Sequence, residues 1–484
     1  MATAMPARPE GCRRRARCAG VVATVLLMAL VPAAPASAVA VAGSAPPVAD
    51  AVDTPGTLDL VAASLEQRDV RMFLRITAAG PWSHNDIAAS PGRALCATLA
   101  VGDPATPRGR ICVTTSRKRP AVRYTPLRAD GSAGRSRPLA ARVTHPGPGI
   151  VQASFLPVAA GLRPGSYTWS VQSTWKDDGA CANVCTDRLP NAGDVPAQLG
   201  LLGVPPCFGA LARDPSTPCE NADLGLGVSP PPSRPKVLLD PYCDRQTHPG
   251  LLTTCTFGAP AADAKGNFAI IGDSHASSLK IPLEVVTLGK RWRGTSIVRA
   301  TCPATQAAKP ILRTRLRARQ CVQWNDQVLD WLKDHREVQT VFLSAYVGAQ
   351  VGRVGSQSMY TTMKAGYREQ IRRMLRLVRR VVVIRDIPTA APGHLACVSA
   401  LVKAGDDPAP ACTQRRRSAV RRDALADAAR GLNARAKVID LTDRFCDRDR
   451  CYSVIGGALV HHDRTHMTTT FGATLGPFIL RALS

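Results

Sequence analysis

The sequence predicts an α/β domain at residues 241–484, built on a flavodoxin-like, doubly wound parallel sheet, with an all-β, sandwich-like domain before it at residues 54–178. Two observations predict the α/β domain. Strand-like runs alternate with helix-like stretches five times, and the first of these runs, at 268–271, is wholly apolar, as buried parallel strands are. The β domain is predicted by many short alternating runs with turn residues between them. A chain of 484 residues is long enough to bury a core in each domain.

The elements of the β domain follow from the alternation of apolar and polar side chains, which is the pattern of strands with one buried face. The clearest alternating runs are 70–76, 141–144 and 166–171. Glycine- and proline-rich turns separate such runs at 79–81, 103–104, 145–148 and 163–165. This arrangement favours a β-sandwich, and no catalytic constellation is evident in this half of the chain.

The elements of the α/β domain follow from apolar runs and the stretches between them. Five runs are predicted to be buried parallel strands, at 268–271, 295–298, 340–343, 381–384 and 437–441. The first predicted helix follows the run at 268–271 and ends at Leu288. The other predicted helices cover 321–334, 359–379 and 415–435, and the last begins at about residue 469. In such sheets, ligands bind outside the carboxyl ends of the strands.

The N-terminal residues 1–38 predict a secretory signal peptide. Four arginines within residues 13–17 precede an apolar run at 19–30 and a small-residue cleavage site at 36–38. An uncleaved membrane anchor is the alternative. No other stretch of the sequence is apolar enough to span a bilayer, so we expect a mature protein that is soluble and extracytoplasmic, either secreted or in the cell envelope.

Two further segments are predicted to connect the domains. Residues 39–53 have little pattern and predict a flexible linker. Residues 179–240 predict a loop-rich, proline-rich connector that carries four cysteines. Within it, residues 229–235 form a stiff run of polyproline character.

The cysteines agree with export. Of sixteen, Cys12 and Cys18 lie in the signal peptide, and the other fourteen fall in near pairs along the chain. In an exported protein this spacing favours local disulfides, although spacing alone does not establish the pairing. The expected pairs are Cys96–Cys112, Cys181–Cys185, Cys207–Cys219, Cys243–Cys255, Cys302–Cys321, Cys397–Cys412 and Cys446–Cys451. The cysteine spacing does not favour a metal site, and we expect no metal and no cofactor.

The chain is strongly basic, with a formal net charge of +26. Such a charge suggests an anionic partner, but a solvated, arginine-rich surface is the favoured interpretation. The arginines at 415–417 and 421–422 form one such basic face, which teichoic acid, phospholipid or an acidic glycan would suit. No nucleic-acid motif accompanies it, so we expect no nucleic-acid partner.

Ser274 is the candidate nucleophile. The first predicted strand runs directly into Gly272-Asp273-Ser274-His275, which places the serine at the carboxyl end of a buried strand and at the start of a helix. There its hydroxyl is presented at the sheet edge, where backbone N–H groups can face a developing oxyanion. Because a serine needs a base to remove its proton, a histidine must lie nearby.

His466 is the candidate base and Asp463 the residue that orients it. Both follow the fifth predicted strand and precede the last helix. A spacing of three residues lets the carboxylate accept a hydrogen bond from one ring nitrogen while the other ring nitrogen faces the serine. The loops after the first and fifth strands open on the same edge of the sheet, so Ser274, His466 and Asp463 are predicted to form one catalytic site.

These motifs resemble the SGNH/GDSL hydrolase superfamily. More closely, residues 243–484 resemble the SGNH domain that is often fused to membrane acyltransferases which O-acetylate cell-envelope polysaccharides. The resemblance rests on the Gly-Asp-Ser-His and Asp-x-x-His motifs and on the cysteines around them. It implies an SGNH hydrolase fold and carboxyl-ester chemistry, with transfer to or hydrolysis from a carbohydrate hydroxyl. It also implies that a membrane acyltransferase is the partner which supplies the acyl group, because this chain lacks the multi-pass domain.

Two positions depart from the pattern of the superfamily. Many members complete the oxyanion hole with a Gly after the second strand and an Asn after the third. Here residues 299–303 and 344–348 follow those strands, and the second segment has no Asn. The backbone N–H of Ser274 is then the one firm oxyanion donor.

The sequence therefore predicts an exported serine esterase or O-acyltransferase, acting on acylated carbohydrate or cell-wall polysaccharide. The alternative is a non-catalytic glycan-binding protein on a degenerate scaffold, and a lipase-like enzyme ranks last. Asp273, His275 and His462 are secondary candidates for the oxyanion site or pocket, and Asp386, after the fourth strand, is a candidate to line it.

Overall fold

The computed structural model describes residues 47–83, 87, 93–101, 106–116, 119–175, 181, 184–217, 219, 221, 224, 227–236, 242–307 and 310–484. The predicted signal peptide and the beginning of the predicted linker lie outside these residues. Within the linker, Val48–Ala49 form the short strand β1, which pairs with β2. The prediction of a flexible linker is therefore wrong at that point. The sequence does not reveal this strand because two residues are too few to form an alternating pattern.

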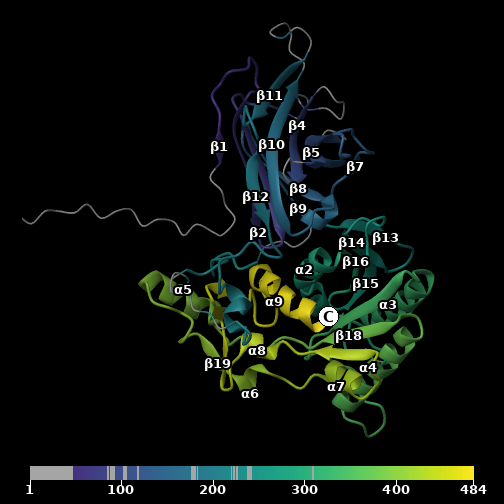
Figure 1. Cartoon of the computed structure of the whole chain (residues 1–484). Helices are drawn as coiled ribbons and strands as arrows, with labels where there is room; N and C mark the ends of the chain where they lie inside the picture. Colours follow the sequence, from purple (N-terminus) through teal and green to yellow (C-terminus); the bar gives the residue numbers. More distant parts are fainter. Residues whose placement is uncertain are drawn as a thin grey trace, which may run out of the picture. The chain divides into compact units, whose positions relative to one another are not determined.

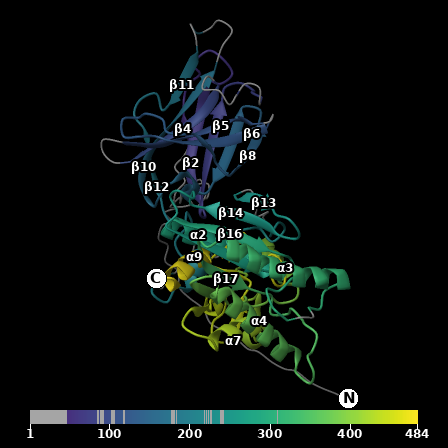
Figure 2. The same ribbon diagram turned by 90° about the vertical axis from the view of Figure 1, so that its right-hand side faces the viewer.

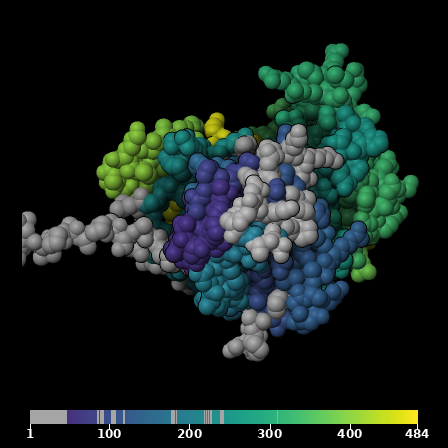
Figure 3. Space-filling view, turned by 90° about the horizontal axis from the view of Figure 1, so that it is seen from above, coloured from purple at the N-terminus to yellow at the C-terminus, as the bar shows by residue number. Residues whose placement is uncertain are grey.

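The N-terminal domain consists of two antiparallel sheets that enclose one core (Figure 1). Its strands are β2 (Leu60–Arg68), β3 (Arg71–Ala78), β4 (Ala94–Val101), β5 (Thr106–Ser116), β6 (Arg119–Pro126), β7 (Arg137–Pro138), β8 (Ala141–Gly147), β9 (Ile150–Phe155), β10 (Gly165–Trp175), β11 (Cys185–Leu189) and β12 (Val195–Leu199). One sheet has the order β1-β2-β3-β9-β8, and the other has β11-β10-β4-β5-β6-β7, with β12 also paired to β10. In the space-filling view, the purple to blue residues of these strands gather in one body (Figure 3).

The β sheets extend beyond the predicted boundary at residue 178. Strands β11 and β12 both pair with β10, so residues 185–199 belong to the β domain and not to a connector. The prediction missed them because cysteines, prolines and glycines surround both strands and hide their alternation. Trp169 on β10 is 2% exposed and packs in the core between the sheets.

The C-terminal domain is built on one seven-stranded sheet of order β13-β14-β16-β15-β17-β18-β20. Its strands are β13 (Asp244–Thr247), β14 (Thr253–Gly258), β15 (Gly266–Gly272), β16 (Trp292–Val298), β17 (Val338–Ser344), β18 (Arg380–Ile384) and β20 (Ala436–Ile439). The last five of these are parallel and correspond to the five predicted strands. The β13–β14 hairpin pairs antiparallel with β16, so the prediction of a wholly parallel sheet is wrong at this edge. All four residues of β13 are exposed, which left no apolar run to detect.

Helices cover both faces of this sheet (Figure 2). Both faces need cover because successive strand residues point to opposite faces and are apolar on each. Phe268 and Ile270 of β15 belong to one core, whereas Ala269 and Ile271 belong to the other. The first core also holds side chains of α1 (Ser274–Ser278), α2 (Lys280–Lys290), α8 (Thr442–Phe445) and α9 (Thr469–Ala482). The second holds side chains of α3 (Arg315–Asp334), α4 (Met359–Leu375) and α7 (Ala424–Arg430). The sheet thus lies between two layers of helices, and both of its faces are buried.

The predicted helix over residues 415–435 is wrong. The segment holds the end of β19 (Thr413–Arg415), the single turn α6 (Arg416–Ala419) and, after a break, α7. The break arises because Asp423 caps α7, its carboxylate accepting hydrogen bonds from the N–H groups of Leu425 and Ala426. A further helix, α5 (His394–Ala404), was not predicted, and α4 ends four residues before the expected Arg379.

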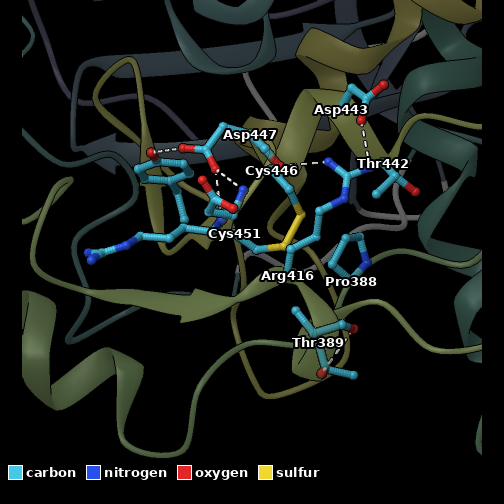
Figure 4. Close-up of a disulfide and its surroundings, with 12 residues drawn as sticks. Pro388, Thr389, Arg416, Thr442, Asp443, Cys446, Asp447 and Cys451 are labelled. Carbon is cyan, nitrogen blue, oxygen red and sulfur yellow. Dashed lines mark hydrogen bonds and ion pairs between the residues drawn. A yellow bond between two sulfur atoms is a disulfide. The ribbon is translucent and has the colours of Figure 1, made fainter.

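All seven expected disulfides are present in the structure, with the expected partners. Cys446–Cys451 closes the turn between α8 and β21 (Arg450–Tyr452) (Figure 4). Beside it, the guanidinium of Arg416 donates to the carboxylate of Asp443 and to the carbonyl oxygen of Asp447, both at 2.7 Å. This turn lies shortly before the loop that carries Asp463. Within the described ranges, no helix combines the length and the apolar character needed to cross a membrane.

Candidate active site

The end of β15 fixes the position of Ser274. Gly272 has a φ of 150°, and a Cβ at this position would lie 2.2 Å from the carbonyl oxygen of Ser344, so only glycine fits. Asp273 is the N-cap of α1, and its Oδ1 accepts a hydrogen bond from the N–H of His275 at 2.9 Å. Ser274 is therefore the first residue of α1, and its N–H has no partner within the helix. The strand and the cap together present its hydroxyl at the carboxyl edge of the sheet.

The structure brings Ser274, His466 and Asp463 together. His466 Nε2 lies 2.8 Å from Ser274 Oγ, and His466 Nδ1 lies 2.8 Å from Asp463 Oδ2. Because a carboxylate only accepts, Nδ1 carries the ring proton and Nε2 presents its lone pair to the serine hydroxyl. This is the tautomer that a general base requires.

Backbone hydrogen bonds hold Asp463 in place. Its Oδ1 accepts from the N–H groups of Thr465 and His466, both at 2.8 Å, which leaves Oδ2 for the imidazole. Partial burial opposes ionisation, but these hydrogen bonds and the imidazole hold the pKa of Asp463 well below its usual range. Its side chain is 47% exposed and that of His466 is 24% exposed, so the site is open to solvent on this side.

The carboxylate of Asp273 accepts hydrogen bonds from backbone N–H groups. Its Oδ2 accepts from the N–H of Tyr346 at 2.9 Å, which ties the start of α1 to the loop after β17. Burial raises the pKa of Asp273 above its ordinary value. Asp273 therefore organises two loops at the sheet edge.

His275 forms a second, buried pair beside the triad. Its Nδ1 lies 2.6 Å from Asp386 Oδ1, and the other carboxylate oxygen of Asp386 accepts from the N–H of Val347. Burial by itself lowers the pKa of His275, but the hydrogen bond and charge of Asp386 outweigh it and raise the pKa above its ordinary value. The ring of His275 lies 4.7 Å from that of Tyr346 and 4.6 Å from that of His466, between centroids.

The pairing of His275 with Asp386 was not predicted. Both residues were noted separately as candidates, because each follows a predicted strand at the carboxyl edge. Only the strand order, which places β17 between β15 and β18, shows which loops meet.

His462 and His461 occupy different environments next to Asp463. His462 stacks on His466 with centroids 5.5 Å apart, and burial lowers its pKa. His461 is buried, and its Nε2 donates to the carbonyl oxygen of Pro388 at 2.7 Å. Its Nδ1 is buried with no hydrogen-bond partner in the described part of the chain, and burial lowers its pKa to about 3. His461 is thus a neutral structural residue, whereas His462 lines the site.

The loop after β16 adopts a conformation that usually needs glycine. Thr301 has a φ of 66°, in the left-handed region that β-branched residues rarely enter. This is the loop in which the superfamily pattern has a Gly. The sequence has no glycine at residues 299–303, and yet the backbone at Thr301 adopts a strained, glycine-like conformation.

Among the residues that the structure describes, two groups of side chains have the composition of a metal site. The ligand atoms of His462, Asp463 and His466 lie within 4.8 Å of one another, as do those of Asp53, Asp59 and Asp187. In the first group, Asp463 and His466 already bond each other and, through His466, the serine hydroxyl. These contacts are those of a proton-transfer site.

Comparison with known proteins relates the C-terminal domain to one family. Residues 242–481, about half of the chain, match the family model described as the SGNH domain fused to AT3 domains. Among curated proteins, none matches the chain. Among solved structures, the periplasmic domain of a lipopolysaccharide acetyltransferase from Salmonella ser. Paratyphi A is similar, with 16% identity and a TM-score of 0.37 over 46% of this chain and 84% of that one. A likeness this weak supports no conclusion about fold or function.

Proposed function

Because residues 242–481 belong to the SGNH domain family, of the kind fused to AT3 domains, we propose that this protein is an exported serine esterase or O-acyltransferase. It either hydrolyses an acyl ester on cell-envelope carbohydrate or transfers an acyl group to a hydroxyl of that carbohydrate. The observation that carries the proposal is the continuous chain of hydrogen bonds from Ser274 through His466 to Asp463, at 2.8 Å in each step.

In the first half-reaction, Ser274 Oγ attacks the ester carbonyl carbon while His466 Nε2 takes the hydroxyl proton. The carbonyl oxygen becomes an oxyanion, which the N–H of Ser274 stabilises at the start of α1. The intermediate then collapses. The bond from the carbonyl carbon to the alcohol oxygen breaks, and His466 returns the proton to the leaving alcohol, which gives an acyl-enzyme and a free hydroxyl.

In the second half-reaction, water or a sugar hydroxyl attacks the acyl-enzyme. His466 removes its proton and passes it to Ser274 Oγ as the serine leaves. Asp463 stabilises the imidazolium in both halves through its hydrogen bond to Nδ1. With water the outcome is hydrolysis, and with a sugar hydroxyl it is transfer.

The disulfides support an extracytoplasmic location, because seven bonds of this kind persist in oxidising compartments. The family description supports a partnership with an AT3 membrane acyltransferase as the acyl donor. In the transferase case, the acyl group moves from the membrane protein to Ser274 and then to the carbohydrate.

A serine-directed assay tests the proposal. The purified protein is expected to hydrolyse p-nitrophenyl acetate and to be labelled by a fluorophosphonate at Ser274, as read by peptide mass spectrometry. Ser277→Ala is the matched control, since Ser277 lies on the same helix and outside the hydrogen-bonded chain. It should keep both activities, whereas Ser274→Ala should lose both.

The alternative is the non-catalytic, glycan-binding scaffold, which the absence of an Asn after β17 favours. A folded wild-type protein with neither turnover nor labelling would decide for this alternative. Labelling with faster turnover on long acyl esters than on acetate would instead indicate a lipase-like enzyme.

A further inference from the structure

A cavity of about 230 Å³ opens beside the candidate active site. The loop after β17, the start of α4 and the segment before α7 form its walls. The residues that matter here are Tyr346, Tyr360, Tyr367, Arg421 and Arg422. Its size suits a single sugar ring better than a drug-sized ligand.

One wall of the cavity belongs to the same network as the triad. Tyr346 contacts the ring of His275, and His275 contacts the ring of His466. The backbone of the wall is fixed as well, because the N–H groups of Tyr346 and Val347 donate to Asp273 and Asp386. A ligand in the cavity would therefore lie next to the reacting groups, against a rigid surface.

The cavity carries positive charge that its own walls do not neutralise. Arg421 and Arg422 are both exposed. Asp423 is the one acid among the described lining residues, and its carboxylate is turned to the backbone N–H groups of Asp386, Leu425 and Ala426. Arg421 and Arg422 thus line the cavity, while the carboxylate of Asp423 is occupied by backbone N–H groups.

The cavity also offers aromatic surface and a buried hydroxyl. Arg422 lies over the ring of Tyr360 at 4.1 Å from its centroid, which holds the guanidinium at the rim. Tyr367 is 3% exposed and lines the cavity, and its hydroxyl has no hydrogen bond within the described residues. Burial raises the pKa of Tyr367 well above its ordinary value, so this hydroxyl is a neutral donor. Because Tyr367 lines the cavity, its hydroxyl is available to a ligand atom or water there.

We propose that this cavity binds one sugar unit of the carbohydrate substrate and that this unit is acidic, with a carboxylate or phosphate held by Arg421 and Arg422. The hydroxyl of Tyr367 bonds the ring oxygens, and the tyrosine rings supply the apolar contact. The inference rests on the proposed function, because it names the substrate class of the same site. A planar guanidinium recognises carboxylate and phosphate by paired hydrogen bonds, which gives the site its preference for charged over neutral sugars.

Binding to the Ser274→Ala protein tests the inference without requiring turnover. Glucose, glucuronate and glucose 6-phosphate are titrated into the full chain by calorimetry at low salt. We expect at least one acidic sugar to bind roughly tenfold or more tightly than glucose, with the preference shrinking as salt rises. The two acidic probes distinguish carboxylate from phosphate recognition.

Two double variants separate specific recognition from general attraction by a basic protein. Arg421→Gln with Arg422→Gln should abolish the preference for the acidic sugar. The single basic face predicted for residues 415–417 and 421–422 is wrong, because the chain breaks between α6 and α7 and Arg417 lines a different cavity from Arg421. Arg417→Gln with Arg448→Gln therefore removes the same charge from another exposed cluster and should leave the preference unchanged. Tyr367→Phe should weaken binding of all three sugars, and its folding is checked by thermal melting.

Equal affinity for glucose and both acidic sugars would overturn the inference, as would equal losses in the two double variants. If acidic sugars bind as expected but the esterase assay fails, the proposed function falls alone. If turnover is found but no acidic preference, this inference falls alone.

Discussion

Replacing Asp463 by Asn tests the hydrogen-bond pattern on which the mechanism depends. The two carboxylate oxygens have separate tasks: Oδ1 accepts from the N–H groups of Thr465 and His466, and Oδ2 accepts from the imidazole. An asparagine has one oxygen and one NH₂ group, so it satisfies only one of the two sets. If its oxygen keeps the two backbone bonds, its NH₂ faces Nδ1 of His466.

That arrangement reverses the tautomer of the base. Nδ1 must then accept, so the ring proton moves to Nε2 and faces Ser274, where a lone pair is needed. The opposite orientation leaves two backbone donors facing an NH₂ group, at about 1–3 kcal/mol for each lost acceptor. The reversed tautomer is therefore favoured, and for a buried aspartate of a triad this change lowers kcat by about 10⁴-fold. Because Asp463 is 47% exposed, water partly replaces it, and we expect a loss of roughly 10³-fold.

The loss is measured as kcat/KM on p-nitrophenyl acetate, with Asp449→Asn as a control at an exposed aspartate remote from the triad. Nitrogen NMR of His466 reports the tautomer independently of turnover and should show the proton on Nδ1 in the wild type and on Nε2 in the variant. An Asp463→Asn protein within about threefold of wild-type activity would refute the reasoning, as would an unchanged tautomer.

Three further outcomes are expected. Ser274→Ala should lower ester turnover by roughly 10³–10⁶-fold with an unchanged melting temperature, and near-wild-type turnover would contradict the mechanism. The mature protein, denatured without reductant, should show no free thiol on titration, because all fourteen of these cysteines are paired; a stoichiometric thiol signal would contradict this. For His461, the folded pKa of about 3 lies below the unfolded value of about 6.5, so its contribution to stability is complete above pH 6.5 and is lost as the pH falls toward 3. Between pH 6.5 and pH 5 this contribution amounts to about 2 kcal/mol, so denaturant unfolding should show a smaller acid-induced loss in His461→Gln, and equal losses would count against it.

The parts of the fold that the sequence predicted are those with a strong local signal. The core strand of residues 268–271 is apolar on both faces, and a run of this kind has few alternatives to a buried parallel strand. The strand order then brings the loops of Ser274 and His466 to one edge. The meeting of residues 192 positions apart was therefore predictable from topology alone.

The parts that the sequence did not predict depend on contacts between distant segments. The carboxylate of Asp423 accepts hydrogen bonds from N–H groups of α7 and of Asp386, and a new helix therefore begins at this residue. The local sequence of the arginine-rich segment does not predict these bonds. The pairing of His275 with Asp386 likewise exists only once β15 and β18 lie on either side of β17. Buried polar networks of this kind belong to the tertiary structure and leave no periodic signal in the sequence.

In the proposed mechanism, the loop after β17 decides where the oxyanion is stabilised. The N–H groups of Tyr346 and Val347 already donate to Asp273 and Asp386, so a tetrahedral intermediate would have to break those bonds to use them. Losing one oxyanion donor costs an enzyme about 10²–10³-fold, which makes the N–H of Ser274 a critical contact. The same two carboxylates fix the positions of α1 and of His275. The loop thus acts as a rigid support that holds Ser274 and His275 in place.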